Sequence, residues 1–252
     1  MITQIHDKKN ELFEVEFYKD KECTEVFDFI GKENLYIKLV NGELTPLVYA
    51  IDKAPCGTKI YCSYANNEIL NPLKIGAGKK HIQIITIDDI TPNLSKYIPE
   101  DNAVLFLSEE TNDKYKGMIF KSGSICISFT KISTLEQIEW LKQGGLFHNK
   151  VTILIDNGTQ SELQKANEVA KELKEKYGVK EVNLFVLHWF DKELYELIQN
   201  KNGSYTSVLK YQNFNKIITT NSTSILKPED SNERLQVIDC KEIFEENLNG
   251  TI

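Results

Sequence analysis

The sequence lacks the features that mark several large classes of protein. No apolar run among its 252 residues approaches the roughly 18 that a membrane-spanning helix needs. The stretch from Met1 to Asn10 has no apolar segment of the kind found in a signal peptide. Basic side chains are outnumbered, because 30 lysines and arginines stand against 37 acidic residues, and the net charge of -7 disfavours a nucleic-acid partner. We therefore expect a cytoplasmic protein that contacts neither a membrane nor nucleic acid.

Cysteines are few and scattered. The five lie at positions 23, 56, 62, 126 and 240, with no CxxC pair and no spacing typical of a zinc site. In a reducing compartment such residues are ordinarily free thiols. The sequence therefore predicts neither a disulfide framework nor a structural zinc ion.

Strands and helices alternate along almost the whole chain. The apolar runs predict strands at residues 11–16, 34–40, 59–64, 81–87, 102–108, 124–129, 151–155, 182–187, 216–219 and 235–238. Helices are predicted at residues 43–53, 91–94, 109–116, 134–143, 161–177, 191–199 and 240–249, and a loop at 71–80. The strands are runs of Val, Ile, Leu and Phe, which is typical of a mostly parallel sheet covered by helices on both faces. The fold class that follows is α/β.

The strongest helical pattern lies in the middle of the chain. From Ser161 to Tyr177, apolar residues recur at spacings of three and four and form one face: Leu163, Ala166, Val169, Ala170 and Leu173. Gly178 is expected to end this helix in a left-handed conformation. The short stretch at residues 95–101 interrupts the alternation of strands and helices and predicts a boundary between two α/β halves, 1–97 and 98–252. For the last helix, 240–249, two alternatives are open: packing within the second half, or packing back on the first half.

One loop stands where an α/β protein binds its ligand. The strand 151–155 ends in Asp156 and Asn157, and the helix follows at once. This places the loop at the carboxyl edge of the sheet, where ligands of such folds bind. Asp156 and Asn157 either contact a ligand or cap the helix, and the same two alternatives hold for Gln160 and Ser161.

Six segments follow one another in the order of a known family's motifs: Phe29–Glu33, Ser63–Ile69, Ile85–Pro92, Asp156–Leu163, Phe185–Lys192 and Ile218–Ser222. In this order they resemble ribose-phosphate diphosphokinases, which make phosphoribosyl diphosphate on the type I phosphoribosyltransferase fold. The C-terminal part is most similar to the compact variant found in phages and bacteria beside nicotinamide phosphoribosyltransferases. The resemblance covers nearly the whole chain and implies two phosphoribosyltransferase-like halves, in a bacterial or phage-infected cytoplasm.

The resemblance also assigns roles to nine residues of this chain. It places a substrate-binding site at Asp156, Asn157, Thr159, Gln160, Ser161 and His188, a metal site for Mg²⁺ at Asp88 and Asp89, and a catalytic lysine at Lys131. Each assignment has a plainer alternative: a buried structural histidine at 188, a solvated lysine at 131, and surface acids at 88 and 89. The magnesium ion is expected only in an active enzyme.

Departures from the family pattern bear on activity. Asn66 and Ile69 stand where the family has the arginines that grip ATP, and neither offers a charged fork to phosphate. Ile87 replaces the metal-associated histidine, and Ser133 replaces the arginine that follows the catalytic lysine. Glu162 stands in the phosphate-binding turn, where its charge opposes a phosphate. The ordinary 5-phosphate site is therefore not expected.

Three hypotheses remain open at this point. The first is a divergent diphosphokinase relative that has lost phosphoribosyl diphosphate synthesis and binds a nucleotide or sugar phosphate, as a regulatory subunit for instance. The second is an active ATP-dependent diphosphokinase with another acceptor, such as ADP-ribose in NAD metabolism. The third is a scaffold or effector partner, since members of this family form homo-oligomers, and a degenerate copy could join a hetero-oligomer.

Overall fold

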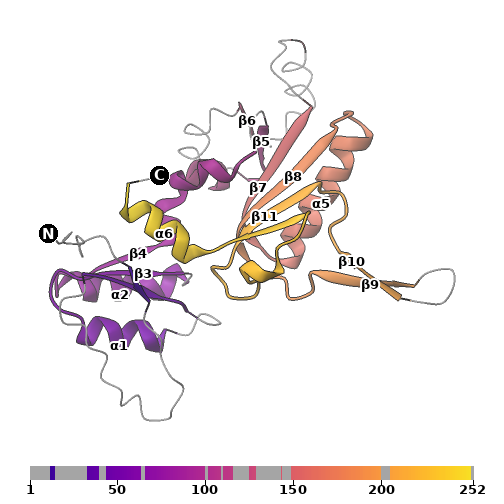
Figure 1. Ribbon diagram of the computed structural model, residues 1–252. Helices are drawn as coiled ribbons and strands as arrows, with labels where there is room; N and C mark the ends of the chain where they lie inside the picture. Colours follow the sequence, from indigo (N-terminus) through magenta and orange to yellow (C-terminus); the bar gives the residue numbers. More distant parts are fainter. Residues whose placement is uncertain are drawn as a thin grey trace, which may run out of the picture. The chain divides into compact units, whose positions relative to one another are not determined.

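The computed structural model describes residues 12–14, 33–39, 44–63, 66–99, 102–108, 110–115, 125–128, 143, 149–199 and 205–250 (Figure 1). The chain divides into two compact units. Unit 1 comprises Met1–Ile90, Ser222–Ser224 and Asp239–Ile252, and unit 2 comprises Thr91–Asn221 and Ile225–Ile238. Each unit contains a parallel sheet, so the predicted α/β class is confirmed. Within the described ranges, no helix has the length and apolarity to cross a membrane.

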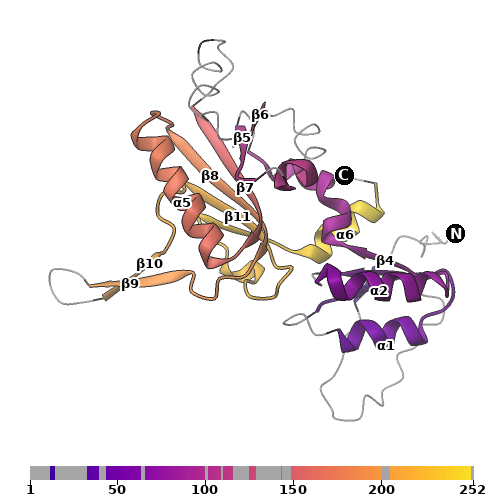
Figure 2. The same cartoon turned by 180° about the vertical axis from the view of Figure 1, so that it is seen from behind.

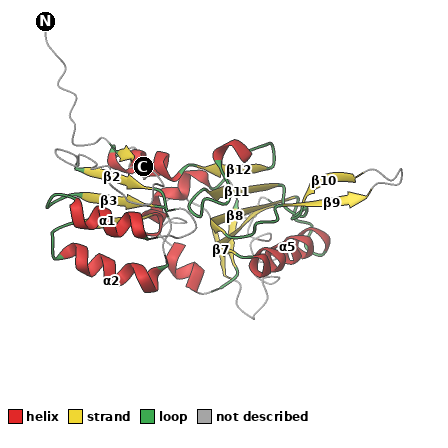
Figure 3. Ribbon diagram, turned by 90° about the horizontal axis from the view of Figure 1, so that it is seen from below, coloured by secondary structure: helices red, strands yellow, loops and turns green. Residues whose placement is uncertain are grey.

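The sheet of unit 1 has its strands in chain order. They are β1 (Phe13–Glu14), β2 (Asn34–Ile37), β3 (Lys59–Cys62) and β4 (Gln83–Thr86), and all neighbours are parallel. Helix α1 (Thr45–Lys53) links β2 to β3, and α2 (Asn67–Gly78) links β3 to β4. Both helices lie on the same face of this sheet (Figure 3). After β4 the chain enters the 3₁₀ helix η2 (Ile87–Tyr97), which is kinked at Ile90.

Helices cover both faces of the sheet in unit 1. Alternate strand residues such as Leu35 and Ile60 pack against Leu47 of α1 and Leu70 of α2. On the other face lie Tyr36 and Tyr61, whose ring centroids are 5.9 and 5.2 Å from that of Phe244. Phe244 belongs to the last helix, α6 (Cys240–Leu248). This alternation follows from the strand geometry, which sends successive side chains to opposite faces.

The loop predicted at residues 71–80 is wrong, because most of it is part of helix α2. Pro72, Gly76 and Gly78 are poor helix formers and suggested a loop. The buried residues Leu70 and Ala77 nevertheless sit seven positions apart, two helical turns, and both enter the core of unit 1. Packing on the sheet therefore outweighs the low intrinsic helix propensity of this segment.

The six-stranded sheet of unit 2 is parallel and reverses its direction of winding once. Its strands are β5 (Ala103–Phe106), β6 (Ile125–Ser128), β7 (Lys150–Gly158), β8 (Glu181–Trp189), β11 (Lys216–Thr220) and β12 (Leu235–Ile238). Their order is β12-β11-β8-β7-β5-β6. The first strand, β5, thus lies between β6 and β7, and from β7 onward the chain winds in the opposite direction. In an open α/β sheet such a switch point marks the position where a ligand binds, outside the carboxyl ends of the strands.

Helix α5 (Gln160–Glu175) covers one face of this sheet (Figure 2). Its buried residues are Leu163, Ala166, Ala170 and Leu173, as the sequence pattern predicted. They pack with Ile153 and Ile155 of β7 and Leu184 of β8 in one core cluster. Gly178 follows the helix with a φ of 65°, the left-handed conformation expected there.

A β-hairpin replaces the helix predicted at residues 191–199, and that prediction is wrong. β9 (Tyr195–Gln199) pairs antiparallel with β10 (Tyr205–Leu209), and the hairpin extends away from the six-stranded sheet (Figures 1 and 2). At its base Leu194 and Leu209 are buried in the core of unit 2. The local spacing of Leu194, Leu197 and Ile198 imitates a helix, but the pairing partner lies further along the chain and sets the conformation.

Candidate ligand site of unit 2

The candidate site lies at the carboxyl ends of β7 and β8. Asp156 is near the end of β7, and its side chain is 24% exposed. Val151, Ile153 and Ile155 point into the core on the α5 side. Asp156 follows in alternation and is therefore presented on the opposite face, beside the switch point between β5 and β7.

Two side chains from the other side of the switch point hold Asp156. Lys114 Nζ and Tyr115 Oη each donate to Asp156 Oδ1 at 2.6 Å. Both donors lie in the helical stretch 110–115, which follows β5. Tyr115 is fully buried, and the Lys114 side chain is 27% exposed. The remaining oxygen, Oδ2, accepts a hydrogen bond from Asn157 Nδ2 at 3.2 Å.

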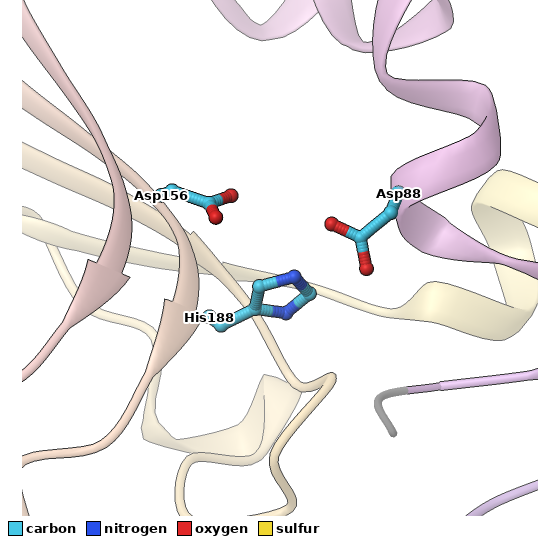
Figure 4. A group of neighbouring side chains, drawn as sticks. All are labelled: Asp88, Asp156 and His188. Atoms are coloured by element: carbon cyan, nitrogen blue, oxygen red, sulfur yellow. The ribbon is translucent and has the colours of Figure 1, made fainter. Parts of the chain in front are cut away.

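His188 is brought to the same place by an irregularity in β8. Val186 and Trp189 both belong to the core on the α5 side although they are three residues apart, so the alternation of faces breaks between them. The register with β11 shifts at this point, between Thr219 and Thr220. A register shift of this kind re-aims a side chain. A ring nitrogen of His188 lies within 4.8 Å of a carboxylate oxygen of Asp156, and the two side chains point to the same side (Figure 4).

Gly158 is required by the close approach of β7 and β8. A Cβ atom at this position would lie 2.6 Å from Val186 Cγ1 and 3.4 Å from the carbonyl oxygen of His188. Real Cβ atoms do not come so near another carbon, so a larger residue would force the Val186 side chain or the strand that carries it to shift. Gly158 also accepts a backbone hydrogen bond from the amide of Phe190 at 3.0 Å. The glycine therefore fixes the strand ends that carry Asp156 and His188.

The N-terminus of α5 is closed by its own residues. Thr159 is the N-cap, and its Oγ1 accepts from the Glu162 amide at 3.4 Å and donates to Glu162 Oε2 at 3.0 Å. Gln160 and Ser161, the sequence-predicted alternatives for this role, are exposed in the first turn. The carboxylate of Glu162 complements the positive end of the helix dipole and disfavours a second anion there.

A polar end of β11 adjoins His188. Thr220 pairs with His188 in the register and donates through Oγ1 to the Leu187 carbonyl at 2.6 Å. Asn221 is 2% exposed, and its amide donates to the Ile238 carbonyl at 3.0 Å. The resemblance includes this segment, but sequence reasoning assigned it no role at the site. A run of buried polar residues directly after an apolar strand was the available signal.

Sequence reasoning also missed Lys114 and Tyr115. They lie 42 and 41 residues before Asp156 in the chain. Only the order of the strands, with β5 beside β7, brings them to it. No local pattern in the sequence could have selected them from other lysines and tyrosines.

The other residues singled out by the sequence belong to unit 1 or lie outside the described residues. In unit 1, Asp89 accepts from Thr86 through the amide at 2.8 Å and the hydroxyl at 2.9 Å, and forms an ion pair with Lys74 at 2.8 Å. Asp88, also drawn in Figure 4, is half-buried at the start of η2. In the same unit, burial raises the pKa of the Cys62 thiol to about 12, so this cysteine stays protonated. Lys131 lies outside the described residues.

Compared with known proteins, the chain matches no family model and no curated sequence. The site gathers one carboxylate, one imidazole, one ammonium and one phenol at the switch point of unit 2. These groups suit a polar ligand that carries both hydroxyls and negative charge.

Proposed function

We propose that unit 2 binds a nucleotide or sugar phosphate at the carboxyl edge of its sheet. The protein would be a divergent ribose-phosphate diphosphokinase-like protein of the cytoplasm, without ordinary phosphoribosyl diphosphate synthesis, acting as a binding or regulatory subunit within a homo- or hetero-oligomer. The observation that carries the proposal is the convergence of Asp156 and His188 at the switch point of the sheet.

Each residue has a role in this proposal that its chemistry supports. A carboxylate accepts about four hydrogen bonds, so Asp156 can take ligand hydroxyls in addition to the donors described above. The other proposed contacts follow Asp156 in the chain: Asn157 near the end of β7, the N-cap Thr159, and Gln160 and Ser161 in the exposed first turn of α5. His188 offers a ring nitrogen beside Asp156.

Magnesium would come with the nucleotide if the protein is active. A metal–nucleotide complex is held largely by phosphate oxygens, so few protein ligands are needed. The carboxylates of Asp88 and Asp89 remain the proposed protein ligands, and Lys131 the proposed catalytic lysine, on the strength of the resemblance. Oxygen ligands of this kind suit Mg²⁺.

The loss of ordinary synthesis is supported by the lack of arginine. The chain has a single arginine, Arg234, and it donates to the carbonyls of Gln212 and Phe214 at 3.2 and 2.6 Å. At the positions of the ATP-gripping arginines, Asn66 caps α2 by accepting from the Glu68 amide, and Ile69 is 55% exposed. Phosphoryl transfer depends on positioned cations, and removing one such group typically costs roughly 3 kcal/mol of transition-state stabilisation.

One observation favours the second candidate, an active diphosphokinase with another acceptor. Glu162 occupies the first turn of α5, where the resemblance places the 5-phosphate of ribose 5-phosphate. A terminal phosphate carries more charge than one that bridges to a further group. A substrate such as ADP-ribose, whose 5-phosphate is esterified, would therefore be repelled less.

Isothermal titration calorimetry with a panel of ligands tests the proposal. The panel is ATP, ribose 5-phosphate, phosphoribosyl diphosphate, ADP-ribose and NAD, each with Mg²⁺. We expect at least one to bind, and we expect Asp156→Asn and His188→Asn to weaken that ligand at least about tenfold, the effect of losing a hydrogen bond to a charged group. Analysis of AMP release with ATP then separates a binding protein from an enzyme.

Matched controls come from unit 1. His81→Asn changes an exposed histidine with a φ of 57°, which Asn accepts, and Asp52→Asn changes a carboxylate that is 60% exposed. Neither should alter binding. If no ligand of the panel binds, or if the controls weaken binding as much as the site variants do, the proposal fails.

A further inference from the structure

We propose that Lys114 is the anion-binding residue of this site. In the absence of ligand, the Asp156 carboxylate occupies the place of the ligand's anionic group beside Lys114. This inference rests on the function proposed above and specifies the ligand. The ligand would be a phosphate ester or diphosphate whose negative group displaces Asp156 from Lys114. The released carboxylate would then accept hydrogen bonds from hydroxyl groups of the same ligand.

Two other kinds of anion binder in the described part of unit 2, an arginine and the N-terminus of α5, are already committed. Arg234, the one arginine of the chain, donates to two backbone carbonyls. The N-terminus of α5 is capped by Thr159 and carries the carboxylate of Glu162. A phosphate at the switch point would therefore depend on a lysine, and Lys114 is the lysine that reaches Asp156.

The contacts of Asp156 show that an anion already fits between the two donors. One oxygen, Oδ1, accepts from both Lys114 Nζ and Tyr115 Oη at 2.6 Å. The Tyr115 side chain is fully buried, and the Lys114 ammonium lies 5.5 Å from the centroid of its ring. A phosphate oxygen is also negatively charged and accepts hydrogen bonds at similar distances. The pair of donors is thus assembled before any ligand arrives, which lowers the entropic cost of binding.

Partial burial favours the replacement of the Asp156 carboxylate by a ligand anion at Lys114. The side chains of Lys114 and Asp156 are 27% and 24% exposed, so a ligand reaches them from solvent. Their surroundings screen charge less than water does, so an ammonium there attracts a phosphate more strongly than a surface lysine would. The carboxylate competes with the ligand for the same ammonium, and this competition gives the proposal a distinctive consequence.

Two substitutions should change anion binding in opposite directions. Lys114→Met removes the charge and keeps the length of the side chain, and it should weaken the best ligand of the panel at least about tenfold. Asp156→Asn removes the competing anion, and it should tighten the binding of inorganic phosphate at least about tenfold, while weakening ligands that present hydroxyls. Lys114→Arg keeps the charge and should retain most of the binding.

Calorimetry with inorganic phosphate and with the best panel ligand measures both effects, and far-UV circular dichroism confirms that each variant is folded. Lys171→Met is the control, since this lysine of α5 is 60% exposed and pairs with Glu175 at 4.0 Å. One outcome overturns the inference and leaves the proposed function standing: the panel ligand binds, but Lys114→Met changes its affinity less than about threefold. That threshold lies below the loss expected for a hydrogen bond to a charged group.

The remaining outcomes also separate the two ideas. If Asp156→Asn gains no affinity for phosphate, Lys114 only positions the carboxylate and the inference is wrong. In a further outcome, no panel ligand binds, Asp156→Asn gains affinity for phosphate, and adding Lys114→Met to that variant abolishes the gain. The anion site then stands and the proposed function fails.

Discussion

At the scale of single residues, Gly158 shows how backbone packing and the site are linked. We expect Gly158→Ala to lower the free energy of unfolding by about 1–3 kcal/mol, the usual cost of overpacking. The reason is that the new methyl group would lie 2.6 Å from Val186 Cγ1. Urea denaturation measures the change, and ligand binding should weaken as well because β7 and β8 carry Asp156 and His188.

Gly76→Ala is the matched control. Gly76 lies in helix α2, and a Cβ there meets nothing within 4 Å. Alanine favours a helix over glycine by roughly 1 kcal/mol, so this variant should be neutral or slightly more stable. Equal destabilisation by both substitutions would show that glycine flexibility, and not the approach of β7 to β8, determines the effect.

Asp191 predicts a dependence of stability on pH. Burial acts to raise the pKa of this carboxyl group, but hydrogen bonds from Tyr211, the Glu193 amide and Lys210 outweigh it and lower the pKa below its ordinary value. A pKa that is lower in the folded state stabilises the protein at pH values above the unfolded pKa of about 3.9. This stabilisation is lost as the pH falls through the folded value.

Asp191→Asn should therefore cost roughly 2 kcal/mol near pH 7 and less below about pH 4. Tyr211→Phe is the companion variant, since it removes one donor and leaves the carboxylate. It should cost less, because the ion pair with Lys210 at 3.2 Å remains. Urea denaturation at several pH values measures both. A cost for Asp191→Asn that is constant from pH 3 to pH 7 would contradict the assignment of a lowered pKa.

At the scale of elements, the cap of α5 gives the next prediction. Thr159→Ala should lower the free energy of unfolding by about 1 kcal/mol, because the amide of Glu162 loses its acceptor. Ser161→Ala, in the exposed first turn, should change stability by less than about 0.5 kcal/mol. Chemical denaturation distinguishes them. A larger effect at Ser161 would move the cap back to the position that the sequence alone suggested.

The helices and strands also show which parts of the fold could be predicted from the sequence. The α/β class and helix α5 follow from residue patterns, because buried strands and amphipathic helices leave direct periodicities. The segments 71–80 and 191–199 were misassigned, since Leu70 and Ala77 form α2 through contacts with the sheet and β9 forms through pairing with β10. Long-range contacts decided both cases, and a local pattern contains no record of them.

The same reasoning applies to the candidate site. Asp156 and His188 could be selected because each lies near the end of an apolar strand, where an α/β fold places its ligand. The presence of Lys114 and Tyr115 at the site depends on the order of the strands. That order puts β5 beside β7, although β6 lies between them in the sequence. That order was not derivable from the separate elements.

At the scale of the whole molecule, the two units differ in how the chain builds them. Unit 1 needs three separate segments, including Asp239–Ile252 at the end of the chain. The last segment supplies α6, whose Phe244 packs against Tyr36 and Tyr61 of the sheet. Unit 2 uses the intervening chain and closes its sheet with β11 and β12. The core of unit 1 is therefore completed only by residues that follow unit 2 in the sequence.

Deleting residues 239–252 should unfold unit 1 selectively. The deletion uncovers one face of its sheet, and the loss of Phe244 alone is expected to cost about 3–5 kcal/mol, the usual cost of removing a buried phenylalanine side chain. Hydrogen exchange followed by mass spectrometry should show loss of protection in β2 and β3, while β7 and β8 stay protected. Deleting only residues 251–252 is the control and should leave both sheets protected. Equal loss of protection in both sheets after the longer deletion would mean that unit 2 cannot hold its fold without the C-terminal helix, and the division into two separately stabilised cores would be wrong.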